Sequence, residues 1–103
     1  MNLVKKPDQH KIVIFMEERD FANPPDMIIE NLKEIIPIST GYEIHLKLQD
    51  VKDIPIRYFA ILLSFFKSMK EKKTSITIKC GKDLLYSLLD AGLGNLVYAI
   101  EEI

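Results

Sequence analysis

The sequence predicts an α/β protein with a mainly parallel sheet. Short apolar runs rich in β-branched residues alternate along the chain with longer segments whose apolar residues recur every three or four positions. The connections between these segments are only a few residues long. Such alternation implies right-handed crossovers, a sheet that is mainly parallel, and helices packed against it. We therefore expect four to five strands and three to four helices in a single domain, residues 1–103.

The first part of the chain predicts one secure strand and one candidate strand. Residues 11–16, KIVIFM, form a short apolar run rich in β-branched side chains, which is typical of a strand buried on both faces. Residues 1–6, MNLVKK, are a candidate antiparallel edge strand beside it. With that addition the sheet has five strands rather than four.

A first amphipathic helix is predicted over residues 22–37, ANPPDMIIENLKEIIP. Asn23 and the two prolines after it suit a helix entry, and Pro37 is expected to close the helix. The apolar residues of this segment fall on one helical face, which is expected to pack on the sheet: Ile28, Leu32, Ile35 and Ile36.

The middle of the chain predicts a strand followed by a long helix. Residues 43–48, EIHLKL, alternate in polarity, so Ile44, Leu46 and Leu48 fall on one side of a strand and His45 and Lys47 on the other. From Ile56 to about Glu71 the apolar residues recur at helical spacing, and they are Phe59, Leu62, Leu63, Phe66 and Met69.

The last third of the chain predicts a third strand, a helix and a fourth strand. The strand is SITIK, residues 75–79, and the helix lies within GKDLLYSLLDAGLG, residues 81–94. We expect Gly92 to be the C-cap of that helix. Its inward side chains are expected to be Leu85, Leu88 and Leu89. The final strand is NLVYAI, residues 95–100.

Charge and cysteine usage narrow the class of protein. Fourteen basic and fifteen acidic residues give a net charge of -1, so the bulk electrostatic attraction of a nucleic-acid or anionic-membrane binder is missing. The single cysteine, Cys80, cannot form an internal disulfide, which fits a reducing cytosol. The N-terminus lacks the apolar core of a signal peptide, and no apolar run approaches the roughly 18–20 residues that span a bilayer. A cytoplasmic protein without membrane insertion is expected.

Residues able to carry chemistry are few and scattered. A nucleotide site needs a glycine-rich turn, whereas Cys80-Gly81-Lys82 offers one glycine and is better explained as a tight turn. His10 and His45 lie apart without metal-site spacing, and neither is placed to activate Cys80 as a nucleophile. The sequence predicts no catalytic residues, no metal and no cofactor, and therefore no enzyme.

Two charged clusters have structural explanations that compete with functional ones. Asp50 and Asp53 flank the loop before the long helix and would suit a cation or an acid–base pair. We favour Asp53 as a cap for the N–H groups of that helix. A group of lysines crowds the end of the same helix, where cations are favoured, and we favour a solvated helix end over an RNA patch: Lys67, Lys70, Lys72 and Lys73.

The order of elements and two local patterns resemble the STAS domain, the fold shared by anti-sigma factor antagonists and the cytoplasmic tails of sulfate transporters. The resemblance covers nearly the whole chain. Residues 44–78, IHLKLQDVKDIPIRYFAILLSFFKSMKEKKTSITI, resemble the family's strand, switch loop, long helix and next strand. Residues 84–100, LLYSLLDAGLGNLVYAI, are similar to its last helix and final strand, with Gly92-Leu93 the best local match.

The switch loop departs from the family pattern. In bacterial antagonists it looks like Asp-Ser-Ser-Gly or Asp-Thr-Ser-Gly, and a partner kinase that is also the anti-sigma factor phosphorylates the second hydroxyl residue. Here Pro55 stands in place of the Asp, Ile56 and Arg57 in place of the two hydroxyl residues, and Tyr58 in place of the glycine. Residues 50–59 contain no Ser or Thr, so the resemblance implies no phosphorylation at this place.

The resemblance implies a non-enzymatic protein-interaction module without the phosphorylation switch. Its expected contact surface is the start of the long helix and the loop before it: Asp53, Ile54, Ile56, Arg57 and Tyr58. Arg and Tyr are favoured in the centres of protein interfaces. An equally supported alternative turns Ile56 and Phe59 inward and leaves Arg57 as an ordinary surface residue.

Two partners and one further function stay open. The partner is an anti-sigma factor kinase or a transporter component, because small STAS subunits of lipid-transport systems also lack the serine. The further function is small-ligand binding in an apolar pocket between helix and sheet, with tyrosines as polar-tipped liners. The tyrosines available for it are Tyr42, Tyr58, Tyr86 and Tyr98, which are more often packing residues at a core edge.

Overall fold

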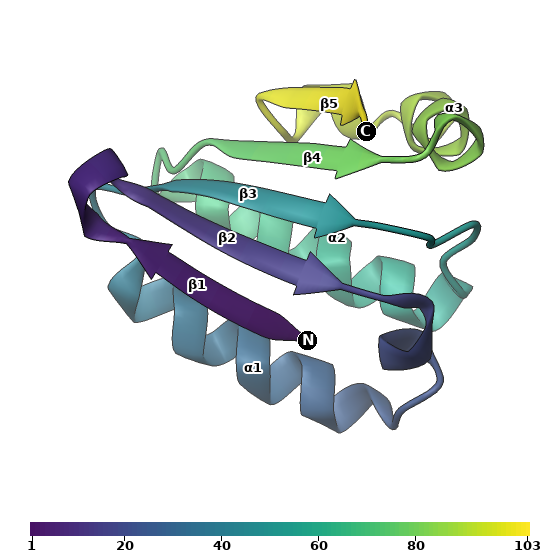
Figure 1. Ribbon diagram of the computed structural model, residues 1–103, viewed down its shortest axis with the longest axis horizontal. Coiled ribbons are helices and arrows are strands. Elements are labelled where there is room, and N and C mark those ends of the chain that lie inside the picture. Colours follow the sequence, from purple (N-terminus) through teal and green to yellow (C-terminus); the bar gives the residue numbers. More distant parts are fainter.

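The computed structural model describes residues 1–103 and has five strands and three α-helices (Figure 1). The strands are β1 (Asn2–Lys6), β2 (Lys11–Met16), β3 (Glu43–Leu48), β4 (Ile76–Cys80) and β5 (Ala99–Glu102). The helices are α1 (Pro25–Ile38), α2 (Ile56–Glu71) and α3 (Lys82–Asp90). Three short 3-10 helices complete the chain, η1 (Pro7–Gln9), η2 (Glu18–Phe21) and η3 (Leu93–Asn95). None of the helices combines the length and the apolar character that a membrane crossing requires.

The five strands form one sheet whose order follows the chain, β1-β2-β3-β4-β5. β1 pairs with β2 in the antiparallel sense, and every other pair is parallel. This confirms the predicted α/β class, the mainly parallel sheet and the antiparallel edge strand at the N-terminus. The arrangement is consistent with a STAS-like fold.

The helices cover one face of the sheet. Figure 1 shows α1 and α2 behind the strands, with no element in front of them. When consecutive parallel strands are neighbours, right-handed crossovers place every connecting helix on the same side. The side chains of the covered face are almost fully buried, as in Ile14, Leu46 and Ile78. They form the core together with the inner faces of the helices, including Leu32 of α1 and Phe66 of α2.

The other face of the sheet has no helical cover, and we call it the open face. Successive side chains of a strand point to opposite faces. Ile12, Ile14 and Met16 of β2 are buried under the helices, so Val13 and Phe15 belong to the open face. The prediction that this strand is buried on both faces is therefore wrong in part. Val13 is only 2% exposed because neighbouring side chains crowd it, but Phe15 is 36% exposed.

Helix α1 continues through Pro37, contrary to the predicted ending, and stops at Ile38. A proline in the last turn removes only one backbone donor. The carbonyl of Ile36 in that turn accepts hydrogen bonds from Ser39 Oγ at 2.7 Å and from Lys72 Nζ at 2.6 Å. These bonds satisfy a carbonyl that the end of a helix leaves without an intrahelical partner.

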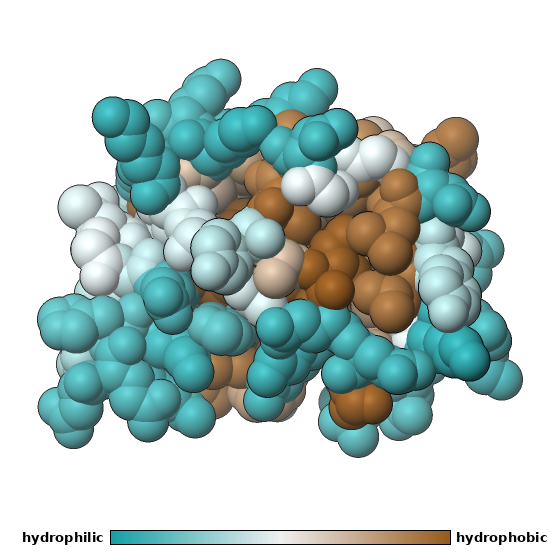
Figure 2. Space-filling view, turned by 90° about the horizontal axis from the view of Figure 1, so that it is seen from above, coloured by the Kyte–Doolittle hydropathy of each residue, from teal (hydrophilic) through white to brown (hydrophobic).

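The predicted inward face of helix α3 is confirmed for Leu88, holds in part for Leu85, which packs against the core, and is wrong for Leu89. Leu84 and Leu88 are buried, while Leu85 is half-buried and Leu89 is 48% exposed. This helix lies beside the outermost strand, as Figure 1 shows, so only a narrow stripe of it meets the core. Figure 2, which views the molecule from the side of β5 and α3, shows the apolar side chains that this packing leaves at the surface.

The chain after α3 forms a tight turn before the last strand. Gly92 has a φ of +82°, and its N–H donates to the carbonyl of Leu89 at 3.0 Å, which confirms its predicted role at the helix end. The strand predicted over residues 95–100 is misplaced, since β5 begins only at Ala99. Within the predicted range, Val97 is buried in the core before the strand begins, whereas Tyr98 is 81% exposed.

Candidate functional site

The loop predicted as a contact surface lies at the carboxyl edge of the parallel strands. β2, β3 and β4 end at this edge, and α1 and α2 both begin there (Figure 1). In open α/β sheets, ligands and partners are met at this edge, because the loops that follow the strands gather there. The loop after β3, residues 49–55, leads directly into α2.

The structure divides the five predicted contact residues into two groups. Ile56 is 87% exposed, and Asp53 and Arg57 are exposed beside it. Ile54 is only 8% exposed and Tyr58 only 2%, and both belong to the hydrophobic core. The outward side chains are therefore available to a partner, whereas the buried ones support the loop from inside.

The side chain of Tyr58 connects the start of α2 with the loop that follows β2. Its hydroxyl donates a hydrogen bond to the carbonyl of Asn23, 35 residues earlier in the chain. Its ring packs edge-on against Phe21, with the centroids 5.6 Å apart. The guanidinium carbon of Arg57 lies 5.6 Å from the centre of the same ring. Tyr58 thus joins two loops, and Arg57 rests on a rigid support.

The capping role predicted for Asp53 is wrong. Its Oδ1 accepts a hydrogen bond from the N–H of Ile54 at 2.9 Å, not from an N–H of the helix. The residue at the cap position is Pro55, which has no side-chain acceptor, so the helix starts without a side-chain cap. Asp53 lies two residues too early because the helix begins only at Ile56.

The fold does not bring together the residues that the sequence offered for metal binding or catalysis. Asp50 and Asp53 belong to no group of three or more ligating side chains suited to a metal ion. His45 pairs with Glu43, their Nε2 and Oε2 atoms 3.5 Å apart, on the open face. Burial raises the pKa of the Cys80 thiol above 9.0, which favours the unreactive protonated form.

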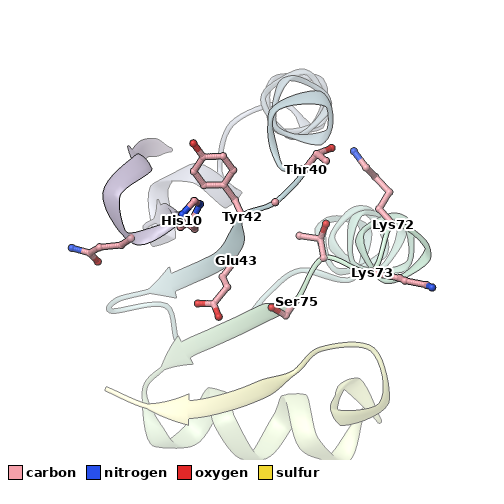
Figure 3. A pocket seen from close by; sticks show the side chains of 10 residues that line it. His10, Thr40, Tyr42, Glu43, Lys72, Lys73 and Ser75 are labelled. Atoms are coloured by element: carbon pink, nitrogen blue, oxygen red, sulfur yellow. The ribbon is translucent and has the colours of Figure 1, made fainter.

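A polar cavity of about 390 Å³ lies at the opposite edge, where α1 and α2 end (Figure 3). Figure 3 shows its charged side chains diverging: Lys73 points outward and Glu43 turns away from Tyr42. Lys72 donates to the carbonyl of Ile36 at 2.6 Å, and Lys70 donates to the carbonyl of Asn95, also at 2.6 Å. The lysines are exposed, as the predicted solvated helix end requires, but these two bonds reach carbonyls of α1 and η3 rather than the end of α2.

The tyrosines named for small-ligand binding do not line a shared pocket. The apolar cleft between helices and sheet has a free volume of about 0 Å³, and none of them lines it. Tyr42 faces the polar cavity, Tyr58 is buried, and Tyr86 and Tyr98 are 55% and 81% exposed. The structure does not bring them together.

One exposed residue of this edge was missed by the sequence analysis. Met27 lies in the first turn of α1, which begins at the same edge as α2, and it is 53% exposed. The sequence could have indicated its exposure, because Met27 follows the prolines at the helix start and does not belong to the apolar face that begins at Ile28. Met27 lies on the side of α1 that faces away from α2, because the groove between the two helices is lined by Ile29, Lys33 and Ile36. We therefore define the α2 entry surface as Asp53, Ile56 and Arg57.

The fold defines a class: an α/β protein with a mainly parallel five-stranded sheet, consistent with a STAS-like arrangement. Comparison of the chain with protein-family models, with curated proteins and with solved structures finds no match. The surfaces of the chain itself are therefore the only guide to its function.

Proposed function

We propose that this chain is a non-enzymatic, cytoplasmic interaction module of the STAS kind, which docks a partner protein through the α2 entry surface. The observation that supports the proposal best is the 87% exposure of Ile56. An isoleucine gains roughly 1.5–3 kcal/mol when it is fully buried, so a partner that covers it gains binding free energy. Arg57 beside it is of the residue type enriched at the centre of interfaces.

Charge at this surface favours a partner with an acidic contact. Arg57 is exposed in the first turn of α2, where the helix dipole adds partial positive charge and no side chain caps the N–H groups. Asp53 is the one acid in the defined surface and lies outside the helix. An acidic side chain of the partner could both pair with Arg57 and bond the free helix N–H groups.

The proposed contact needs no phosphorylation switch. Tyr58 is the only hydroxyl residue in positions 50–59, and it is 2% exposed with its hydroxyl bonded to Asn23. A kinase would have to unfold the start of α2 to reach it. A fixed positive charge at Arg57 would give a constitutive contact, unlike the added negative charge of a phosphate.

Two partners suit this proposal, an anti-sigma factor kinase and a component of a membrane transporter. The genes next to this one distinguish them, because a kinase-fold or sigma-factor gene supports the first and transporter genes support the second.

Affinity capture from the native host tests the docking surface. The variant Ile56→Ser/Arg57→Glu removes the exposed apolar side chain and reverses the charge, and we expect it to lose the partner retained by the wild type. Tyr98→Ser/Lys67→Glu makes similar changes at exposed positions outside the α2 entry surface and should retain it. Equal recovery of every partner by both variants would eliminate this surface.

A further inference from the structure

The open face of the sheet carries lysines in directly opposed pairs. Lys6 of β1 is the register partner of Lys11 of β2, and Lys47 of β3 is the register partner of Lys79 of β4. All four side chains point to the open face, because they follow the same alternation as Val13 and Phe15. Like charges directly opposite each other destabilise a sheet. The lysines of each pair on the open face therefore repel each other, and this unfavourable interaction is not needed to form the fold.

The chain has three ion pairs, and none of them includes one of these lysines, although Glu101 is the register partner of Lys79. The ion pairs join Met1 to Asp20, Arg19 to Glu17 and His45 to Glu43. Glu43 is the register partner of Lys11, yet its carboxylate pairs with the histidine of its own strand.

Protection of a sheet edge explains only part of this pattern. Lysines on an edge strand discourage unwanted pairing with other chains, and Lys6 lies on such a strand. Lys47 and Lys79 lie on β3 and β4, which have neighbours on both sides. Their opposition needs another explanation.

Between the two lysine pairs runs a weakly polar row. It crosses all five strands in register and consists of Val4, Val13, His45, Thr77 and Ala99. Val4 is 42% exposed at one end of the row. Phe15 lies next to the row, with Lys47 Nζ 5.5 Å from the centre of its ring.

The dimensions of this pattern match a helix laid across the strands. Five strands spaced by about 4.8 Å span roughly 19 Å, the length of about 13 helical residues. The lysine pairs are four residues apart along the strands, or about 13 Å, and a helix with its side chains is about 10–12 Å wide. Acids on both flanks of such a helix would reach both lysine pairs.

We infer that the open face binds an acidic amphipathic helix of a partner protein, whose apolar stripe covers the exposed side chains of Val4 and Phe15 and whose carboxylates pair with the lysines. The open-face lysines Lys6, Lys11, Lys47 and Lys79 outnumber its acids, Glu43 and Glu101, although the chain as a whole has a net charge of -1. The overall negative charge disfavours a nucleic acid in general, and a single aromatic side chain on the face, Phe15, disfavours a single strand, which stacks its bases on several rings. This surface is separate from the α2 entry surface.

A designed peptide tests the inference directly. The probe is a fluorescein-labelled helix of about 18 residues with leucines on one face and glutamates on both flanks, titrated by anisotropy at about 50 mM salt. The test variant is Lys6→Glu/Lys47→Glu, which takes one lysine from each opposed pair. We expect at least about tenfold weaker binding, equivalent to about 1.4 kcal/mol.

Lys33→Glu/Lys67→Glu is the matched control, since it makes the same change in net charge on α1 and α2. Peptide binding to it should stay within about twofold of wild type, and a peptide with lysines in place of the glutamates should not bind. Amide shifts of the wild type should move on β2, β3 and β4 and stay fixed at Ile56 and Arg57.

Three outcomes would overturn the inference. They are a failure of the wild type to bind the acidic peptide, an equal loss of affinity in the control variant, and tighter binding of an oligothymidylate of about 12 nucleotides. Shifts confined to the start of α2 would assign the peptide to the other surface and also overturn it.

Discussion

Neighbouring residues at the start of α2 have opposite environments. Arg57 is exposed, while Tyr58 is 2% exposed and holds the loop before α1 through its hydrogen bond to Asn23. The sequence left two arrangements open, one with all five contact residues outward and one with Ile56 and Phe59 inward. Neither is right as a whole, because Ile54 and Tyr58 are buried while Ile56 is exposed. The division into outward and inward residues depends on where the helix begins, and Ile54 lies before its first turn, where helical periodicity gives no information.

The hydroxyl of Tyr58 should contribute to stability more than to contact with a partner. Tyr58→Phe removes the hydrogen bond to the Asn23 carbonyl, and we expect the free energy of unfolding to fall by about 1 kcal/mol. Urea unfolding measures this change. Tyr98→Phe, at an 81% exposed tyrosine, is the control and should leave the midpoint unchanged. Equal midpoints for wild type and Tyr58→Phe would show that the bond is not stabilising.

At the scale of elements, periodicity predicted the three α-helices and the succession of strands and helices along the chain, but none of the 3-10 helices. β3 and α2 have the predicted bounds, because alternation and helical spacing are unambiguous there. The predicted bounds are wrong where tertiary packing, and not the local sequence pattern, determines where an element begins or ends. Pro37 is accommodated by the bonds that Ser39 and Lys72 make to the last turn of α1, and β5 starts late because the 3-10 helix η3 extends to Asn95. Sequence patterns contain neither effect.

Opposed lysines on neighbouring strands should make the free protein less stable than it could be. Lys6→Glu places an acid opposite Lys11, and Lys6 has no partner strand on its other side. We expect the free energy of unfolding to rise by about 0.2–1 kcal/mol in urea at low salt. The gain should shrink at about 1 M salt, where the Debye length is about 3 Å.

Lys33→Glu on the exposed surface of α1 is the control for that change and should not give the same gain. A loss of stability in Lys6→Glu, or a gain that salt does not reduce, would contradict electrostatic repulsion between Lys6 and Lys11.

At the scale of the whole molecule, ionisation of the Cys80 thiol should make the free energy of unfolding depend on pH. Burial raises the pKa of this thiol above the ordinary 9.0, so the thiol ionises more readily in the unfolded chain. Above pH 9 unfolding therefore releases a proton, and the stability contributed by the protonated thiol is lost as pH rises. We expect the free energy of unfolding to decline more steeply between pH 8.5 and about pH 10 than in Cys80→Ala.

Paired urea titrations of the two proteins at these pH values isolate the thiol, because the lysines and tyrosines that also titrate there are common to both. Parallel declines in wild type and Cys80→Ala would show that the thiol does not contribute.

The agreement between strand order and chain order has a consequence for how the protein folds. Each new strand pairs with the strand made just before it, so no pairing waits for a distant part of the chain. Paired residues of neighbouring parallel strands, such as Lys11 and Glu43, lie no more than 32 positions apart, so closing each loop costs less entropy than pairing the two ends of the chain would. The sheet can grow by one strand at a time while the chain leaves the ribosome, with β2 to β4 each covered by the next helix as it emerges.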